Sequence, residues 1–170
     1  NWIHGAIEEV ELDPPYGLVT TAASIHWMHW ETVLGRFHDV LTPRGYLAIV
    51  GGAGAESEWD DELNFIGEFS LNKDFRPYTI ASIVDEFESR GIFEKKGERA
   101  TKPITFRQSL EEYVESFHAT NGLSRDRMDP EQAASFDERM REVVLKHRPD
   151  GEVELKITAQ VIWGRPRPAS

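Results

Sequence analysis

The chain contains no cysteine among its 170 residues, and this absence removes several kinds of chemistry at once. Without thiols there is no disulfide framework, no thiolate metal site and no cysteine nucleophile. A protein without cysteine also fits a reducing compartment, because disulfides persist mainly outside the cytosol. We therefore expect a cytoplasmic protein.

Basic residues are scarce as well. The 19 Lys and Arg residues are outnumbered by 30 Asp and Glu residues, and the formal net charge is −11. Binding to a phosphate backbone needs clustered cations that displace counterions, so nucleic acid is not an expected partner. No window approaches the roughly 18 consecutive apolar residues of a membrane helix, so no membrane partner is expected either.

The length allows one ordinary domain, since 170 residues bury one sizeable core but are few for two. We predict a single domain over residues 1–164. The Pro-rich end of the chain, residues 165–170, has no periodic pattern and is expected to form a flexible tail.

A glycine-rich phosphate or nucleoside loop is also absent, although the rest of a βαβ unit is present. Tyr16–Ala22 is an uncharged, β-prone run, typical of a parallel strand that is covered on both faces. Trp30–Leu41 has apolar residues at helical spacing, and Pro43 and Gly45 stop that helix. Tyr46–Val50 then supplies a second strand after a crossover of the length that parallel strands require.

The second half of the chain carries clear helix starts and one alternating strand. Ser109 and Glu112 have the spacing of a capping box, and Asp129 followed by Pro130 is typical of another helix start. These two helices look like an inserted cap. From Val153 to Val161 apolar and polar residues alternate, which predicts an antiparallel, partly exposed strand that closes the sheet.

Three passages together resemble a known family: YGLVTTAASIHWM, DVLTPRGYLAIV and VELKITAQVIWGR. They are similar to the second half of class I S-adenosylmethionine-dependent methyltransferases, especially the small-molecule branch that includes trans-aconitate methyltransferase-like proteins. The resemblance implies an α/β, partial Rossmann-like methyltransferase fold with a mostly parallel sheet, strands in the family order 4-5-7-6, an antiparallel last strand and inserted cap helices. Tyr16–Ala22 would be the fourth strand and Asn1–Gly5 the end of the third.

The same resemblance implies where S-adenosylmethionine would bind. Backbone groups of Ala6 and Ile7 would contact the adenine, and Thr21 and Ala22 would line the methionine end. Ala6 stands where the family commonly has an aspartate, and Gly17 stands at a second such position. The family's glycine-rich turn has no counterpart here.

Several side chains are candidates for the acceptor side of such a site. His26 is the candidate catalytic residue, because an imidazole with a pKa near 6.5 can take a proton from the acceptor. Alternatively, His26 simply locks the bend, or elbow, that follows the strand Tyr16–Ala22. Trp27 and Trp30 would bind the acceptor as an aromatic wall, or belong to the core. Arg125 and Arg127 would clamp an acceptor carboxylate, or lie in a solvated loop.

No metal site is expected. His26 and His29 are three residues apart and share a helical face, but zinc needs a third protein ligand and none has a suitable spacing.

Two functional interpretations stay open. The first is methyl transfer to a small-molecule acceptor, with this chain as the substrate-side part of a truncated methyltransferase domain that needs an N-terminal half for activity. The second is a non-catalytic remnant that serves as a binding or oligomerisation module. In both, the strand Tyr16–Ala22 lacks a neighbour on one edge, so we expect a homo-oligomer or pairing with a separate N-terminal half.

Overall fold

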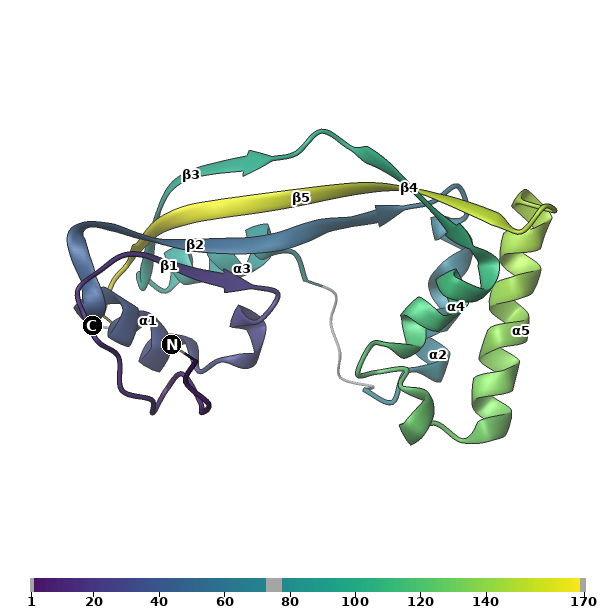
Figure 1. Cartoon of the computed structure of the whole chain (residues 1–170), viewed down its shortest axis with the longest axis horizontal. Coiled ribbons are helices and arrows are strands. Elements are labelled where there is room, and N and C mark those ends of the chain that lie inside the picture. Colours follow the sequence, from purple (N-terminus) through teal and green to yellow (C-terminus); the bar gives the residue numbers. More distant parts are fainter. Residues whose placement is uncertain (1, 73–77, 169–170) are drawn as a thin grey trace. The chain divides into compact units, whose positions relative to one another are not determined.

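The structure, a computed structural model, describes residues 2–72 and 78–168. Contacts divide the chain into two compact units, and each is described here by itself (Figure 1). Unit 1 consists of Asn1–Gly54, Tyr78–Lys102 and Thr158–Ser170, and unit 2 of Ala55–Pro77 and Pro103–Ile157. The long strands β2 (Leu41–Glu56) and β5 (Glu152–Pro166) contribute residues to both units. A single domain over residues 1–164 stays a prediction.

Unit 1 contains a sheet with the strand order β1-β2-β5-β3, where β1 is Tyr16–Ala22 and β3 is Phe93–Ala100. This order confirms the expected family order 4-5-7-6. β1 pairs parallel to β2, and β3 pairs antiparallel to β5, so the antiparallel last strand is confirmed too. The expectation of a mostly parallel sheet is wrong. β5 lies between β2 and β3 in the strand order, and it runs antiparallel to β3.

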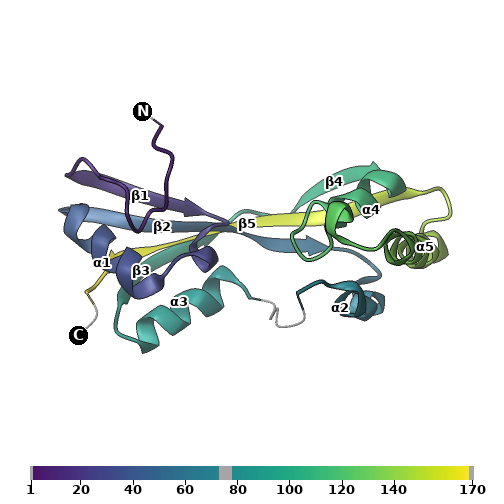
Figure 2. The ribbon, with the colours of Figure 1, turned by 90° about the horizontal axis from the view of Figure 1, so that it is seen from below.

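Helices α1 (Trp30–Val40) and α3 (Ile80–Ser89) lie on the same side of this sheet (Figures 1 and 2). Each helix has an apolar stripe at helical spacing and buries it, because removing such side chains from water stabilises the fold by about 1.5–3 kcal/mol each. The core of unit 1 is formed by these stripes and by strand residues, including Val33, Leu34, Phe37, Leu47, Ile49, Val84, Phe87 and Ile162.

Strand β1 forms an end of the strand order and pairs only with β2 among the described residues. Thr21 is buried and Val19 packs against the core, whereas Leu18 is 58% exposed. The expectation that β1 is covered on both faces is therefore wrong for the face that carries Leu18. Alternate side chains of a strand point to opposite faces, and only one face of β1 is packed.

Three boundaries differ from the sequence prediction. Residues 2–5 form no strand, although Asn1–Gly5 was expected to end one; Asn1 lies outside the described residues. The expected turn at residues 42–45 belongs to the start of β2, with a register shift against β1. β5 continues to Pro166, and the amide of Arg167 donates to the Ile92 carbonyl at 2.8 Å, so the ordered chain extends into the expected tail; residues 169–170 lie outside the description.

Unit 2 has its own core beneath helices α4 (Leu110–His118) and α5 (Pro130–His147). The predicted capping box at the start of α4 is confirmed, since Ser109 and Glu112 exchange hydrogen bonds with each other's backbone. The Asp129 carboxylate caps α5 as expected. The remaining elements of unit 2 are η2 (Asp60–Phe65), α2 (Ile66–Phe69), η3 (Arg125–Arg127) and β4 (Ile104–Ser109), which pairs antiparallel to the first part of β5.

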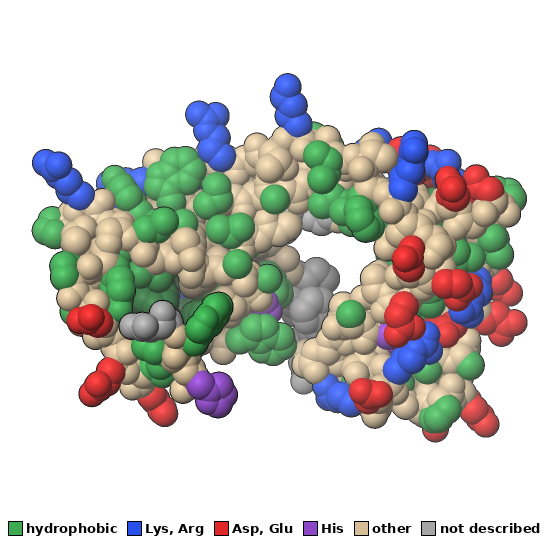
Figure 3. Space-filling model, in the orientation of Figure 1, with side chains coloured by type: hydrophobic (Ala, Val, Ile, Leu, Met, Phe, Trp, Pro, Cys, Tyr) green, Lys and Arg blue, Asp and Glu red, His purple; other side chains and the backbone are tan. Residues whose placement is uncertain are grey.

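The surface of unit 2 carries acidic and basic side chains side by side (Figure 3), and many of them form ion pairs, such as Arg141 with Glu111 at 2.6 Å. Within the described ranges, no helix has both the length and the apolar composition of a membrane span. The same residues contain no group of three or more His, Asp or Glu placed to hold a metal ion.

Candidate functional site

The backbone changes direction sharply where β1 ends. Ala23 follows the strand with φ at 48°, and no other non-glycine residue in the described ranges has a positive φ. A left-handed alanine costs about 1–2 kcal/mol, because its Cβ crowds the next carbonyl. The amide of Ala23 donates to the Val50 carbonyl at 3.2 Å, which holds this conformation against β2. The strained elbow therefore lies at the carboxyl end of two parallel strands, where open α/β sheets bind ligands.

The residue two positions earlier carries a second unusual feature. Thr21 is 4% exposed, and its hydroxyl oxygen has no hydrogen-bond partner among the described residues. A buried hydroxyl without a partner costs about 1–3 kcal/mol, so a water or a ligand group is expected to bond to it. The next residue, Ala22, is exposed. Both residues, which the resemblance assigned to the cofactor, thus lie directly before the strained Ala23.

Three aromatic rings meet beyond the elbow, and we call them the aromatic cluster: His26, Trp27 and Tyr78. The ring centroid of His26 lies 4.7 Å from that of Trp27 and 4.6 Å from that of Tyr78, with the planes tilted by 45° and 38°. Partial burial lowers the pKa of His26 and raises the pKa of Tyr78, because it disfavours both charged forms. The cluster is therefore uncharged near neutral pH, and Trp27 remains 68% exposed.

Trp30 has a different environment from Trp27. Its indole Nε1 donates to the Ile25 carbonyl at 2.9 Å, and its ring packs edge-on against Phe87. The guanidinium of Arg90 lies 5.2 Å from the centroid of the indole ring. Trp30 thus joins the elbow to the core and to α3.

The turn that contains Ala6 and Ile7 is attached to the start of α1. The amide of His29 donates to the Glu8 carboxylate at 3.0 Å, and Arg36 donates to the Glu8 carbonyl at 2.9 Å. The bond from His29 is the main reason why the pKa of Glu8 is lowered. Ala6 is exposed and Ile7 packs against the core of unit 1. This attachment connects the predicted adenine-contacting turn to the helix that follows the elbow.

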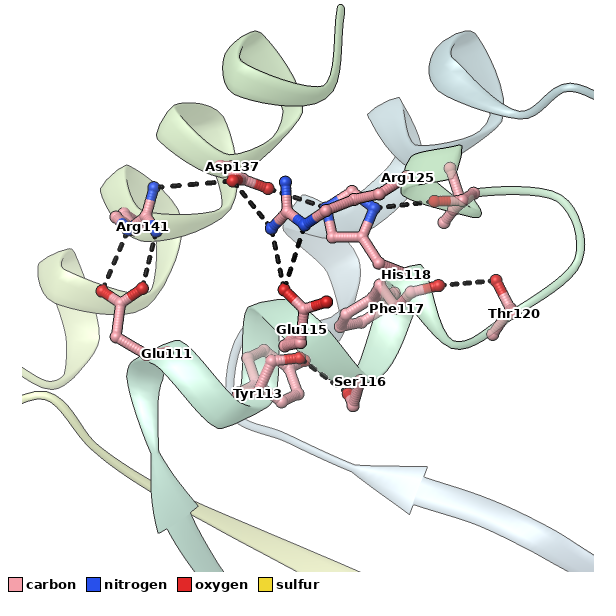
Figure 4. A network of polar contacts seen from close by, with 11 residues as sticks. Glu111, Tyr113, Glu115, Ser116, Phe117, His118, Thr120, Arg125, Asp137 and Arg141 are labelled. Carbon is pink, nitrogen blue, oxygen red and sulfur yellow. Dashed lines mark hydrogen bonds and ion pairs between the residues drawn. The ribbon is translucent and has the colours of Figure 1, made fainter. Parts of the chain in front are cut away.

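Arg125 and Arg127 belong to unit 2 and are already engaged there. Arg125 donates to the carboxylates of Glu115 and Asp137 at 2.9 and 3.0 Å (Figure 4). Arg127 donates to the backbone and side-chain oxygens of Asn121. The other predicted site residues all belong to unit 1.

Sequence reasoning missed three residues of this site: Glu8, Ala23 and Tyr78. Glu8 and Tyr78 meet partners 21 and 52 positions away, His29 and His26, so no local spacing could reveal them. The positive φ of Ala23 had no signal either, since glycine or asparagine is the usual residue at such a position.

A separate hollow of about 350 Å³ lies in unit 1 where β2 begins. Its two arginines are engaged within the chain: Arg167 pairs with Glu94 at 3.0 Å, and Arg165 donates to the Pro43 carbonyl. It lies at the start of β2 rather than at the carboxyl end of the parallel strands, and the site described above does not include it.

Comparison with known proteins supports the fold. No protein-family model and no curated protein matches the sequence. Among solved structures, a proposed type II methyltransferase from Anaeromyxobacter dehalogenans matches with a TM-score of 0.63 and 15% identity, over 95% of this chain and 70% of that one. A proposed methyltransferase from Bacillus halodurans C-125 matches with a TM-score of 0.50 and 15% identity, over 98% of this chain and 70% of that one. The chain therefore has a methyltransferase-type α/β fold, as the sequence predicted.

Proposed function

We propose that this chain takes part in S-adenosylmethionine-dependent methyl transfer to a small-molecule acceptor, with the elbow of unit 1 as its acceptor side. The observation that carries the proposal is the strained Ala23 beside the unpaired, buried Thr21 hydroxyl, at the carboxyl end of parallel strands in a methyltransferase-type fold. A strained residue and an unsatisfied polar group each lower the stability of the fold. Strained residues of this kind cluster at ligand-binding sites, where they serve the function.

The residues present suit the methionine end of this cofactor. Thr21 offers a buried hydroxyl without a partner among the described residues, which would hydrogen-bond the methionine end. Ala6 has no side-chain acceptor, so adenine would be held by backbone groups of Ala6 and Ile7. When bound, S-adenosylmethionine supplies a methyl group to the acceptor's lone pair, while the C–S electron pair stays on sulfur.

His26 has the role of proton acceptor in this proposal. Its lowered pKa keeps the imidazole neutral, so a ring nitrogen has a lone pair for the proton that the acceptor loses. Trp27 would contact the acceptor, and Trp30 would hold the elbow in place through its bond to Ile25. Arg125 and Arg127 belong to unit 2 and are not part of this proposed site; their guanidinium groups already bind Glu115, Asp137 and Asn121.

Calorimetric titration with S-adenosylhomocysteine tests the proposal. We expect saturable binding that Thr21→Val weakens about fivefold, because the variant removes the hydroxyl and keeps the shape. Thr20→Val is the matched control, since Thr20 is exposed on the same strand. The Thr21 variant should also unfold at equal or higher urea concentration, as it removes an unpaired buried group. Absence of binding to the unmodified chain would refute the proposal.

The exposed edge of β1 favours a second function, that of a non-catalytic binding or oligomerisation module. β1 is uncharged, contains no proline and presents Leu18 at 58% exposure, and strands of this kind associate with other strands. We propose self-association, or pairing with a separate N-terminal half, through this edge, in a cytoplasmic protein. Sedimentation of the unmodified chain and of Leu18→Lys tests it: a monomer in both cases would contradict association.

A further inference from the structure

The aromatic cluster differs from the other aromatic contacts of unit 1 because one of its rings remains open to solvent. Trp27 is 68% exposed, and among the described residues no guanidinium or ammonium group is placed over its ring. Trp30, three residues later, already has the guanidinium of Arg90 against its ring. Trp30 therefore has a cation from within the chain, whereas Trp27 has an open face for a cation from outside.

Among the described residues, two arginines near the elbow are already engaged within the chain. Arg36 of α1 donates to the carbonyls of Glu8 and Val10, and Arg90 beyond α3 pairs with Glu31 and Glu86. An acceptor carboxylate or phosphate would need a free guanidinium or ammonium group to replace its lost hydration. Both nearby arginines would first have to give up their present partners.

A cationic ligand, in contrast, finds favourable contacts at the aromatic cluster. The rings of His26 and Trp27 are uncharged, they are tilted against each other by 45°, and an indole face attracts cations more strongly than a phenol or phenyl face. The chain's net charge of −11 also raises the local concentration of cations and lowers that of anions.

We propose that the acceptor bound at the aromatic cluster is an amine that arrives protonated, as an alkylated ammonium with at least one N–H, held over Trp27 by cation–π attraction. Its N–H proton passes to His26, and the nitrogen lone pair that this frees takes the methyl group. The assignment of this ligand as methyl acceptor rests on the proposed function. The binding itself depends only on the cluster, so the two are tested separately.

The probes are choline and 3,3-dimethyl-1-butanol, which have the same shape and differ in the positive charge. We expect choline to shift the indole N–H resonance of Trp27 in a saturable way, and the neutral alcohol to bind about three- to tenfold more weakly. Trp27→Leu should abolish the choline effect. Trp2→Leu is the control, since Trp2 is an exposed tryptophan outside the cluster, and it should change nothing.

Each outcome decides between the proposals. Equal binding of choline and the neutral alcohol would show a merely apolar surface and overturn the cation assignment, as would no binding of either probe. If choline still bound to the Trp27→Leu variant, its site would lie elsewhere, and this result would also overturn the assignment of a cation site at Trp27. If S-adenosylhomocysteine binds and choline does not, methyl transfer stands and the cationic acceptor falls; the reverse result keeps the cation site and removes the proposed methyl transfer.

Discussion

Replacing Asp137 by asparagine should destabilise unit 2 strongly, because its carboxylate joins three elements. One carboxylate oxygen accepts a hydrogen bond from His118 at 2.8 Å, and the other accepts one from Arg125 at 3.0 Å (Figure 4). The other ring nitrogen of His118 lies 2.7 Å from the Leu123 carbonyl. The Leu123 carbonyl and the Asp137 carboxylate thus hold the buried imidazole from both sides and join α4 to α5.

The size of the effect follows from burial. His118 is 6% exposed and Asp137 is 8% exposed, so water cannot replace the lost partner. Removing the charged member of a buried hydrogen-bonded pair leaves its partner unsatisfied and costs about 3 kcal/mol, and the half-exposed contact with Arg125 adds little to this. We expect Asp137→Asn to cost about 3 kcal/mol. Arg107→Gln removes an ion pair with Glu154 whose arginine is 73% exposed, and it should cost less than about 1 kcal/mol.

Urea denaturation and amide hydrogen exchange measure this difference. The midpoint should fall for Asp137→Asn at constant m value, and exchange should speed up in α4 and α5 more than in α3 of unit 1. In a double-mutant cycle with His118→Ala, the two changes should couple by about 1–3 kcal/mol. A cost below about 1 kcal/mol, equal to that of Arg107→Gln, would refute the reasoning, because the pair would then be worth no more than a solvated one.

Three further predictions concern unit 1. Ala23→Gly should raise the free energy of unfolding by about 0.5–1 kcal/mol, because relief of the left-handed strain exceeds the entropy that glycine adds to the unfolded chain; a lower urea midpoint would contradict it. Gly164→Ala should cost about 1–3 kcal/mol, since a Cβ would clash with the Glu94 carbonyl oxygen, whereas Gly17→Ala has open space and should be neutral in the same assay. The lowered pKa of His26 predicts that stability falls as the pH drops below the unfolded value of 6.5 and levels off below the folded pKa; an NMR titration of His26 with a midpoint at or above 6.5 would disprove this.

Local features were predicted well because they depend on neighbouring residues. The capping box of Ser109 and Glu112 and the cap at Asp129 involve groups within three positions, and both are present as expected. The alternation after Val153 predicted an antiparallel strand, and β5 is one. The strand order 4-5-7-6 came from the resemblance, and the structure shows the same order.

Features that depend on distant contacts were not predicted. The uncharged run of β1 indicated cover on both faces, but which faces are covered is decided by helices packed elsewhere in the chain, and Leu18 remains exposed. The bond from His29 to Glu8 spans 21 positions, and no spacing rule applies to it. Arg125 looked available for a ligand until the structure showed it between Glu115 and Asp137.

The sequence alone therefore determined β1, α1, β5, the caps of α4 and α5 and the absence of thiol chemistry, since these follow from residue type and short-range spacing. The tertiary structure decided which groups are strained, unpaired or engaged: the positive φ of Ala23, the buried hydroxyl of Thr21 and the ring contacts of His26. The physical reason is that strain, desolvation and charge pairing are properties of three-dimensional surroundings, and residues far apart in the chain create those surroundings.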